Sequence, residues 1–248
     1  MYIILIAIIL LIFIFVLSYY NKGDYFTFEN FITEEEKLQL VKCKKLLSSN
    51  KLNLSSFKNS KSAVYYFKDF NYFHKICESK DIITLYKVFE SIIKNAPKKG
   101  NYYIVNLLEI EPIDSNLEKS YNPELHYDDT IMDILPKPID FRMIKNNNYF
   151  NPETVCVLYI CKDKCFNGGE LDLYKGPVLS NPLLGKDLIG SINISDRNLV
   201  YFSGDYYHGV KSYSIEKCKN NIDSRFSLVI EIYYVDERII DLLPNKEK

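Results

Sequence analysis

Residues 225–235 read RFSLVIEIYYV, a run of β-branched and aromatic residues in which the more polar side chains recur at every second position. Successive side chains of a strand point to opposite faces, so Arg225 and Ser227 share one side while Phe226 and Leu228 share the other. Upstream, four runs have the same character and are separated by Asn, Asp, Gly and Pro: residues 101–112, 153–162, 169–175 and 198–204. The pattern predicts an antiparallel β sandwich or barrel.

The first hundred residues favour helices instead. Thr33 and Glu36 have the spacing of a capping box, which predicts a helix that begins there. Residues 81–95 predict a second helix, ended by Pro97 and Gly100. We expect an α+β, mainly β fold with three parts: an N-terminal segment 1–20, a helical support region 21–100 and a β core 101–240.

The charge balance bears on possible partners. The 248 residues carry 31 Lys+Arg and 32 Asp+Glu, a formal net charge of -1. General binding to nucleic acid needs a basic surface that displaces counterions, so no nucleic-acid partner is expected. The six cysteines show no pair of spacings typical of a zinc site, which favours buried thiols.

Residues 1–20, MYIILIAIILLIFIFVLSYY, are predominantly apolar and contain no charged side chain. About 20 such residues can cross a hydrocarbon core of ~30 Å as a helix, and Tyr19 and Tyr20 suit an interfacial belt. A cleaved signal peptide is the alternative, but no basic start or small-residue cleavage site is clear. We expect a single-pass membrane anchor. A single nearby basic residue, Lys22, does not decide whether the rest of the chain lies on the cytosolic or the lumenal side of the membrane.

The chain has only three histidines, and two of them occur in a pattern that predicts metal binding. His126 and Asp128 are two residues apart, so on an extended segment both side chains point the same way, whereas Asp129 points elsewhere. His208, in the later run YYHGV, can supply a third ligand. Two histidines and one carboxylate on a face of Fe(II) leave three positions open for a cosubstrate and O₂.

Arg225 and Ser227, at the start of the last predicted strand, face one side together. A guanidinium at that depth can bind a carboxylate with two charge-assisted hydrogen bonds, and Ser227 can add a hydroxyl. A metal centre with such an arginine beyond it predicts a dicarboxylic 2-oxo acid as cosubstrate. Lys211, Lys217 and Lys219 are alternatives to Arg225, but they lie in a polar segment.

The order HYD, HGV and RFS on a β-rich C-terminal half resembles the 2-oxoglutarate- and Fe(II)-dependent dioxygenases. Within them, FENFITEEEKLQLV (28–41) and CFNGGELDLY (165–174) are similar to the prolyl 4-hydroxylase-like branch, and the resemblance spans residues 26–235. It implies a double-stranded β-helix (jelly-roll) fold, with His126, Asp128 and His208 as iron ligands. Arg225 and Ser227 would bind 2-oxoglutarate, and ascorbate dependence is a further family expectation.

The resemblance implies an enzyme that hydroxylates a protein or peptide side chain and releases succinate and CO₂. The branch often uses Lys where this chain has Arg225, which leaves the prolyl substrate open. Residues 132–151 are a candidate substrate-covering loop. The alternatives are a silent membrane-tethered binding module and a nucleic-acid demethylase; position 231 is Glu, where demethylases of this kind usually show a second Arg.

Overall fold

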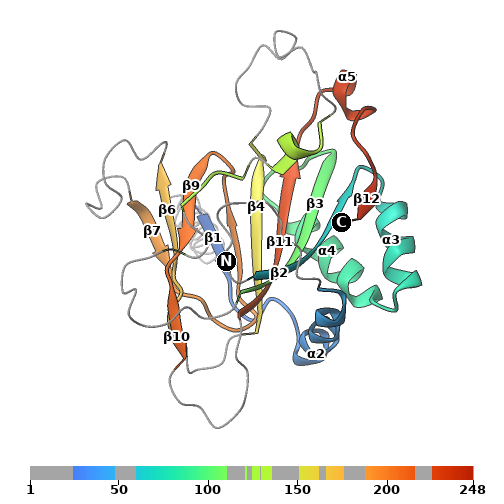
Figure 1. Cartoon of the computed structure of the whole chain (residues 1–248). Coiled ribbons are helices and arrows are strands. Elements are labelled where there is room, and N and C mark those ends of the chain that lie inside the picture. The colour runs from blue at the N-terminus through green and yellow to red at the C-terminus, as the bar shows by residue number, and fades with distance from the viewer. Residues whose placement is uncertain are drawn as a thin grey trace, which may run out of the picture.

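The computed structural model describes residues 25–47, 60–110, 121, 125–128, 130–135, 151–161, 166–175, 188–215 and 225–247. Two β-sheets face each other, and helices cover the outer side of the larger sheet (Figure 1). All strand pairings are antiparallel. The described part therefore has the mainly β, α+β architecture that the sequence predicts.

The large sheet has seven strands in the order β1-β8-β4-β11-β3-β2-β12. Their bounds are β1 (Tyr25–Phe28), β8 (Leu199–Phe202), β4 (Thr154–Cys161), β11 (Arg225–Tyr233), β3 (Tyr102–Ile110), β2 (Ser60–Phe67) and β12 (Lys246–Glu247). β11 lies between β3 and β4 and pairs with both, with an irregularity in the β4 register between Phe226 and Ser227. The predicted strand at 225–235 is thus a central strand of the sheet.

The facing sheet is smaller. It has the order β7-β6-β9, from β7 (Leu188–Ile192), β6 (Leu171–Lys175) and β9 (Tyr206–Val210), and a ribbon of β10 (Tyr213–Ile215) and β5 (Phe166–Gly168) continues the same layer (Figure 1). Apolar side chains of both sheets, such as Val155 and Tyr159 on β4 and Leu173 on β6, pack together in the space between them. This layer closes the barrel over the inner face of the large sheet.

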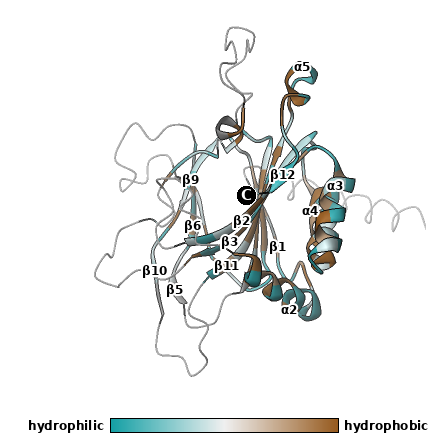
Figure 2. Cartoon of the chain, turned by 45° about the vertical axis from the view of Figure 1, so that its right-hand side comes forward, coloured by the Kyte–Doolittle hydropathy of each residue, from teal (hydrophilic) through white to brown (hydrophobic). Residues whose placement is uncertain are grey.

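Three helices and a short 3-10 turn cover the outer face of the large sheet: α2 (Glu34–Lys42), η1 (Cys43–Leu46), α3 (Phe70–Ser79) and α4 (Ile83–Asn95). The buried residues of α4 are all apolar, among them Leu85, Phe89 and Ile92, and Figure 2 shows hydrophobic and hydrophilic stretches along this helix. The rings of Phe67, Phe73, Phe89 and Tyr103 lie 4.5–5.8 Å apart and form the centre of this layer. The helices therefore make the large sheet a rigid wall that is buried on both faces.

The predicted helices at Thr33 and at 81–95 are confirmed. The Thr33 hydroxyl accepts a hydrogen bond from the Glu36 amide at 3.1 Å, and the Glu36 carboxylate accepts one from the Thr33 amide at 2.8 Å. The region 21–100 is not only helical, however, because β1 and β2 lie within it and belong to the large sheet, and α3 was not predicted. β2 pairs with β3 along its whole length.

The predicted anchor at residues 1–20 lies outside the described residues. Among the helices that the structure describes, none has the length and apolar character needed to cross a membrane.

We expect the aromatic centre of the helical layer to dominate the stability of this half of the molecule. Phe89 is fully buried, so Phe89→Ala should lower the free energy of unfolding by about 3–5 kcal/mol through lost contacts and a cavity. Tyr234→Ala, at a side chain that is 62% exposed, should change it by less than about 0.5 kcal/mol. Urea unfolding of both variants checks this, and equal losses would contradict it.

Candidate metal centre

The segment 125–128 lies alongside β9, and a pair of backbone hydrogen bonds joins them at the two histidines. The His126 amide donates to the His208 carbonyl at 2.8 Å, and the His208 amide donates to the His126 carbonyl at 2.9 Å. Gly209 permits this approach, because a Cβ there would lie 3.1 Å from both the amide nitrogen and the Cα of Leu125. The glycine of the HGV motif thus brings the two predicted ligands side by side.

The three predicted ligands converge on one point in the space between the sheets. Asp128 Oδ1 lies 3.5 Å from His126 Nε2, and Asp128 Oδ2 lies 3.4 Å from His208 Nε2. The ligand atoms of all three residues lie within 4.8 Å of one another. The imidazole centroids are 4.5 Å apart, and Phe202 packs edge-on against the His208 ring at 4.8 Å. The arrangement has the size and donor set of a facial metal triad.

His208 is held in the form that a metal ligand needs. Its Nδ1 lies 3.1 Å from the Tyr206 carbonyl oxygen, which fixes the proton on Nδ1 and leaves the Nε2 lone pair toward Asp128. Burial, together with the nearby His126, lowers the pKa of His208 to about 4, although Asp128 acts in the opposite direction. The imidazole is therefore neutral at neutral pH.

Asp128 is a buried, ionised carboxylate. Burial alone would raise its pKa, but the attraction of His208 in its protonated form and the hydrogen bond with His126 outweigh this and lower it. Its Oδ2 has no hydrogen-bond partner among the described residues. An ionised oxygen that faces an imidazole lone pair at 3.4 Å is costly unless a cation lies between them. The residues present thus fit a divalent metal ion.

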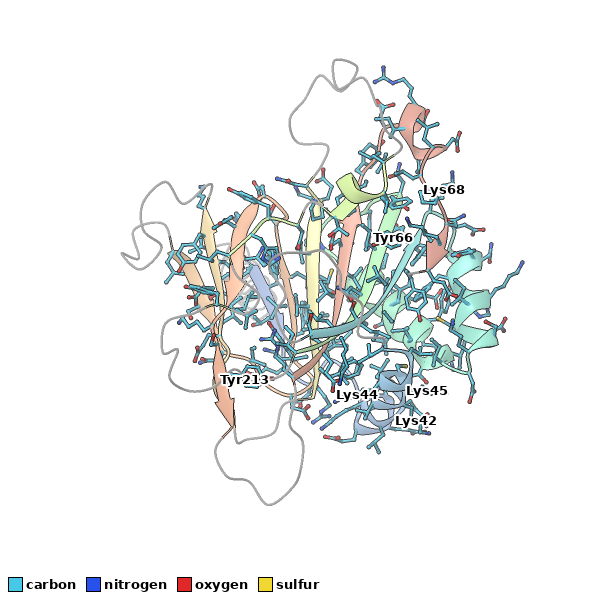
Figure 3. The ribbon with its side chains drawn as sticks, viewed as in Figure 1. Lys42, Lys44, Lys45, Tyr66, Lys68 and Tyr213 are labelled. Carbon is cyan, nitrogen blue, oxygen red and sulfur yellow. The ribbon has the colours of Figure 1, made fainter. Side chains whose placement is uncertain are left out.

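Arg225 and Ser227 are placed as predicted, on the side of β11 that faces the small sheet. Both are nearly inaccessible, and Phe226 and Leu228 pack on the opposite side with the helices. The Arg225 guanidinium lies 6.0 Å from the ring centroid of Tyr213, and the Tyr213 hydroxyl accepts a hydrogen bond from the Arg225 amide at 3.0 Å. Tyr213 lies near the lower end of the barrel (Figure 3).

The Arg225 side chain has unused donors. Within the described part of the chain, its Nε and Nη1 are buried and have no hydrogen-bond partner. Burial lowers the pKa of Arg225, but a guanidinium stays protonated in proteins. A buried cation with two unpaired donors is costly, so it fits the carboxylate of a small-molecule ligand.

Further polar groups on this inner surface lack a partner in the described chain, Tyr159 and Asn106 among them. Tyr159 on β4 pairs in register with Ser227, and its hydroxyl is buried and unpaired. Burial raises the pKa of Tyr159 to about 12, against the effect of Arg225, so the hydroxyl is a neutral donor. Asn106 on β3 is similar, with an unpaired Oδ1. The sequence analysis missed Tyr159, although the period-two pattern of its strand predicts which face it lies on.

The other sequence-level candidates lie elsewhere. Lys211 is engaged with Asp172 at 3.3 Å, and Lys217 and Lys219 fall outside the described residues. Tyr103 packs in the aromatic centre of the helical layer. His74 lies on α3 and contacts the Tyr86 ring. Most of the candidate covering loop, at 136–150, is also outside the described residues.

Glu231, the position that argued against a demethylase, supports the segment that carries Asp128. Its carboxylate accepts a hydrogen bond from the Thr130 hydroxyl at 2.9 Å and another from the Tyr233 hydroxyl. Ile131, beside Thr130, is buried against Tyr233 and Val235. The chain that follows Asp128 is thereby fixed to the inner face of the large sheet.

Comparisons with known proteins place this fold. An Fe(II)/α-ketoglutarate-dependent dioxygenase, TqaL, is similar with a TM-score of 0.52 and 12% identity, over 95% of this chain and 93% of that one. HygX from Streptomyces hygroscopicus, solved with nickel and 2-oxoglutarate bound, has a TM-score of 0.52 and 9% identity, over 88% and 85%. The chain has the 2-oxoglutarate/Fe(II) oxygenase fold.

The oxygenase fold carries the HxD…H triad geometry in this chain, at His126, Asp128 and His208. A prolyl hydroxylase from Trichoplax adhaerens, in complex with a peptide fragment of a hypoxia inducible factor, is 13% identical with a TM-score of 0.46, over 91% of this chain and 89% of that one. That likeness does not separate the prolyl hydroxylases from other dioxygenases. No protein-family model and no curated protein sequence matches the chain.

The pKa of His208 makes stability depend on pH in the metal-free protein. The folded-state value of about 4 lies below the ordinary 6.5, so between these values the unfolded chain binds more protons. Stability should therefore fall as the pH drops from about 6.5 to about 4, by at most about 1.4 kcal/mol per unit from this group. Chemical unfolding with a chelator present, at half-unit steps of pH, measures it.

The matched comparison is His208→Gln against the wild type. Replacing His208 should flatten the pH dependence in this window. A slope that stays unchanged in His208→Gln would show that another group is responsible.

Proposed function

We propose that this chain is an Fe(II)- and 2-oxoglutarate-dependent dioxygenase that hydroxylates a protein or peptide side chain. The observation that carries the proposal is one barrel interior that holds two incomplete sites. One is a buried carboxylate with two imidazoles around it, and the other is a buried guanidinium with two unused donors. A metal ion completes the first site, and the far carboxylate of a 2-oxo dicarboxylic acid completes the second.

The chain's own residues bind and orient the reactants. His126, Asp128 and His208 would hold the iron, which, when bound, supplies the redox chemistry that couples oxidation of 2-oxoglutarate by O₂ to hydroxylation of the substrate. Two neutral imidazoles and one carboxylate would leave a site of net charge +1 on Fe(II). This favours an anionic cosubstrate over water.

The cosubstrate's far carboxylate would bind at the start of β11. Arg225 offers Nε and Nη1, the Tyr159 hydroxyl can donate a further hydrogen bond, and Ser227 lies opposite Tyr159 across the strand pair. These groups are fixed by the backbone pairing of β11 with β3 and β4, so little conformational entropy is lost when the acid binds. The ketone end would then lie toward the metal.

The lining between the two sites is apolar. Val155 and Val157 on β4, Leu173 on β6 and Phe202 on β8 belong to the core cluster between the sheets. A lining of this kind excludes water, which strengthens the charge interactions inside it and protects reactive species from side reactions. The site therefore suits oxidation of an unactivated C–H bond.

Support for a protein or peptide substrate comes from the sequence. The entry at 28–41 and the GGEL segment are similar to the prolyl 4-hydroxylase-like branch, and the near-neutral net charge disfavours nucleic acid. Prolyl 4-hydroxylation is the finer form of the proposal, and ascorbate would serve as an accessory reductant in it.

The cosubstrate assignment predicts an acid selectivity that depends on Arg225. Pyruvate shares the 2-oxo acid group of 2-oxoglutarate but lacks the far carboxylate. With Mn(II) in anaerobic buffer, 2-oxoglutarate should raise the melting temperature of the wild type by several degrees when present at 100 times its Kd, and pyruvate should do so only at much higher concentration. Arg225→Met should weaken 2-oxoglutarate by at least about a hundredfold, since a buried charge pair is lost, and leave pyruvate unchanged.

Asp128→Ala and Arg238→Ala are the two controls. Asp128→Ala should abolish both shifts and the turnover of 2-oxoglutarate to succinate, because a metal ligand is lost. Arg238, a surface arginine paired with Asp236, should be replaceable without effect on either acid. If Arg225→Met kept the wild-type preference for 2-oxoglutarate, the assignment of the far carboxylate to Arg225 would be wrong.

The substrate class has its own test. Full-length protein with Fe(II), 2-oxoglutarate, ascorbate and O₂ should add the mass of one oxygen atom to members of a peptide library, and tandem mass spectrometry locates the modified residue. Proline-rich, lysine-rich and other aliphatic peptides form separate pools, with Asp128→Ala as the blank. If methylated oligonucleotides were oxidised and no peptide were modified, the protein would be a nucleic-acid demethylase and not a peptide hydroxylase.

A further inference from the structure

The outer face of the small sheet holds a buried polar cluster that lies outside the candidate site. Its centre is Asp172 on β6, whose side chain points away from the large sheet and is almost inaccessible. Tyr121 and Ser191 donate hydrogen bonds to its two oxygens at 2.9 and 2.6 Å, and Lys211 Nζ lies 3.3 Å from Oδ1. The hydroxyls of Tyr121 and Tyr174 are also 2.9 Å apart.

This cluster fully pairs a buried carboxylate, which would otherwise destabilise the fold. Its members come from β6, β7, the residue after β9, and Tyr121, a position far from these strands in the sequence. We call Tyr121, Asp172, Ser191 and Lys211 the outer clamp. Apolar residues of similar volume could fill the same space without destabilising the fold. The polar partners therefore indicate that these residues hold one another in defined positions, and do not only stabilise the fold.

The outer clamp includes Tyr121, which precedes His126 by five positions in the sequence. Tyr121 pairs with Lys211 through an isolated antiparallel bridge, and His126 pairs with His208 through another. Four residues separate Tyr121 from His126, whereas two separate His208 from Lys211, so the two bridges do not form one continuous ladder. Regular ladder pairing therefore does not fix the position of His126, which needs a further anchor.

Tyr121 supplies this anchor through its side chain. Its hydroxyl reaches past β9 to Asp172 and Tyr174 on β6, and Asp172 is paired in register with Gly209 of β9. The same Gly209 lies against Leu125, next to His126. The segment that carries His126 is thus held at Gly209 on one side and at the outer clamp on the other.

Among the three proposed ligands, His126 has the most exposed side chain, 19% against 10% for Asp128 and 8% for His208. It also lies outside any regular strand, since its pairing is an isolated bridge. We propose that the outer clamp positions His126 for metal binding, with Tyr121 and Asp172 as positioning residues that do not touch the metal. This inference rests on the proposed metal centre.

The test measures the Kd of Mn(II), from the free Mn(II) signal in electron paramagnetic resonance, in wild type and variants without turnover. Tyr121→Phe keeps the ring but removes the hydroxyl, which frees this end of the segment and leaves Asp172 Oδ2 without that donor. Metal affinity should fall by about tenfold or more, the usual effect of removing a group that orients a ligand. Asp172→Asn should act similarly.

Tyr201→Phe is the matched control, because it makes the same substitution on the helical side of the large sheet. The Tyr201 hydroxyl donates to the Ile92 carbonyl at 2.8 Å and is buried. This variant should lose a comparable amount of thermal stability and keep the wild-type Kd for Mn(II). A double-mutant cycle of Tyr121→Phe with Asp172→Asn should be non-additive in the Kd, since both act through one hydrogen bond.

The outcomes separate the two proposals. If the wild type binds no Mn(II), the metal centre is wrong and the clamp inference is wrong with it. If the wild type binds and Tyr121→Phe has a Kd within twofold of it, the outer clamp is only structural and the proposed function stands. If Tyr121→Phe does not fold, Ser191→Ala removes a single donor from Asp172, and a Kd weakened less than about threefold would then overturn the inference.

Discussion

The pair of backbone hydrogen bonds between His126 and His208 is the contact on which the candidate site depends. His126 and Asp128 come from one short segment, and His208 comes from β9. The bridge is the backbone contact that brings these two parts of the chain together at the site. Gly209 makes the bridge possible by having no Cβ where Leu125 lies, so one glycine links the backbone geometry to the chemistry.

The barrel interior keeps two opposite charges apart and both incomplete. Asp128 has an unpaired oxygen, and Arg225 has two unpaired donors within the described chain. Asp128 belongs to the segment 125–128, whereas Arg225 belongs to the central strand β11. If the two were simply packed together they would neutralise each other and fill the site. Their separation costs stability in the empty protein, and a metal ion with a dicarboxylic acid can relieve both costs at once.

Much of this could be predicted from the sequence, because the informative patterns are local. Alternation along 225–233 gives the face of Arg225 and Ser227, and the His126–Asp128 spacing gives a shared direction; both follow from the pleat of a strand. β2 was not predicted, because its first three residues, SKS, are polar and its strand partner β3 lies 36 to 50 residues later in the chain. The unpaired hydroxyl of Tyr159 could not be foreseen, since no local pattern tells a satisfied tyrosine from an unsatisfied one. The outer clamp could not be predicted for the same reason, because Tyr121 contacts Asp172 only through the tertiary fold.

The two halves of the site are positioned by different physical means, and this bears on what the molecule can recognise. Arg225 belongs to a central strand with ladder partners on both sides, so its depth in the barrel is fixed by backbone hydrogen bonds. His126 and Asp128 belong to a segment held by isolated bridges, one glycine contact and side-chain hydrogen bonds. The two ends of the proposed site therefore differ in how they are held. In the proposed function, the preference for a diacid depends on the depth of Arg225 in the sheet, and the geometry of the metal ligands depends on the contacts that hold the segment 125–128.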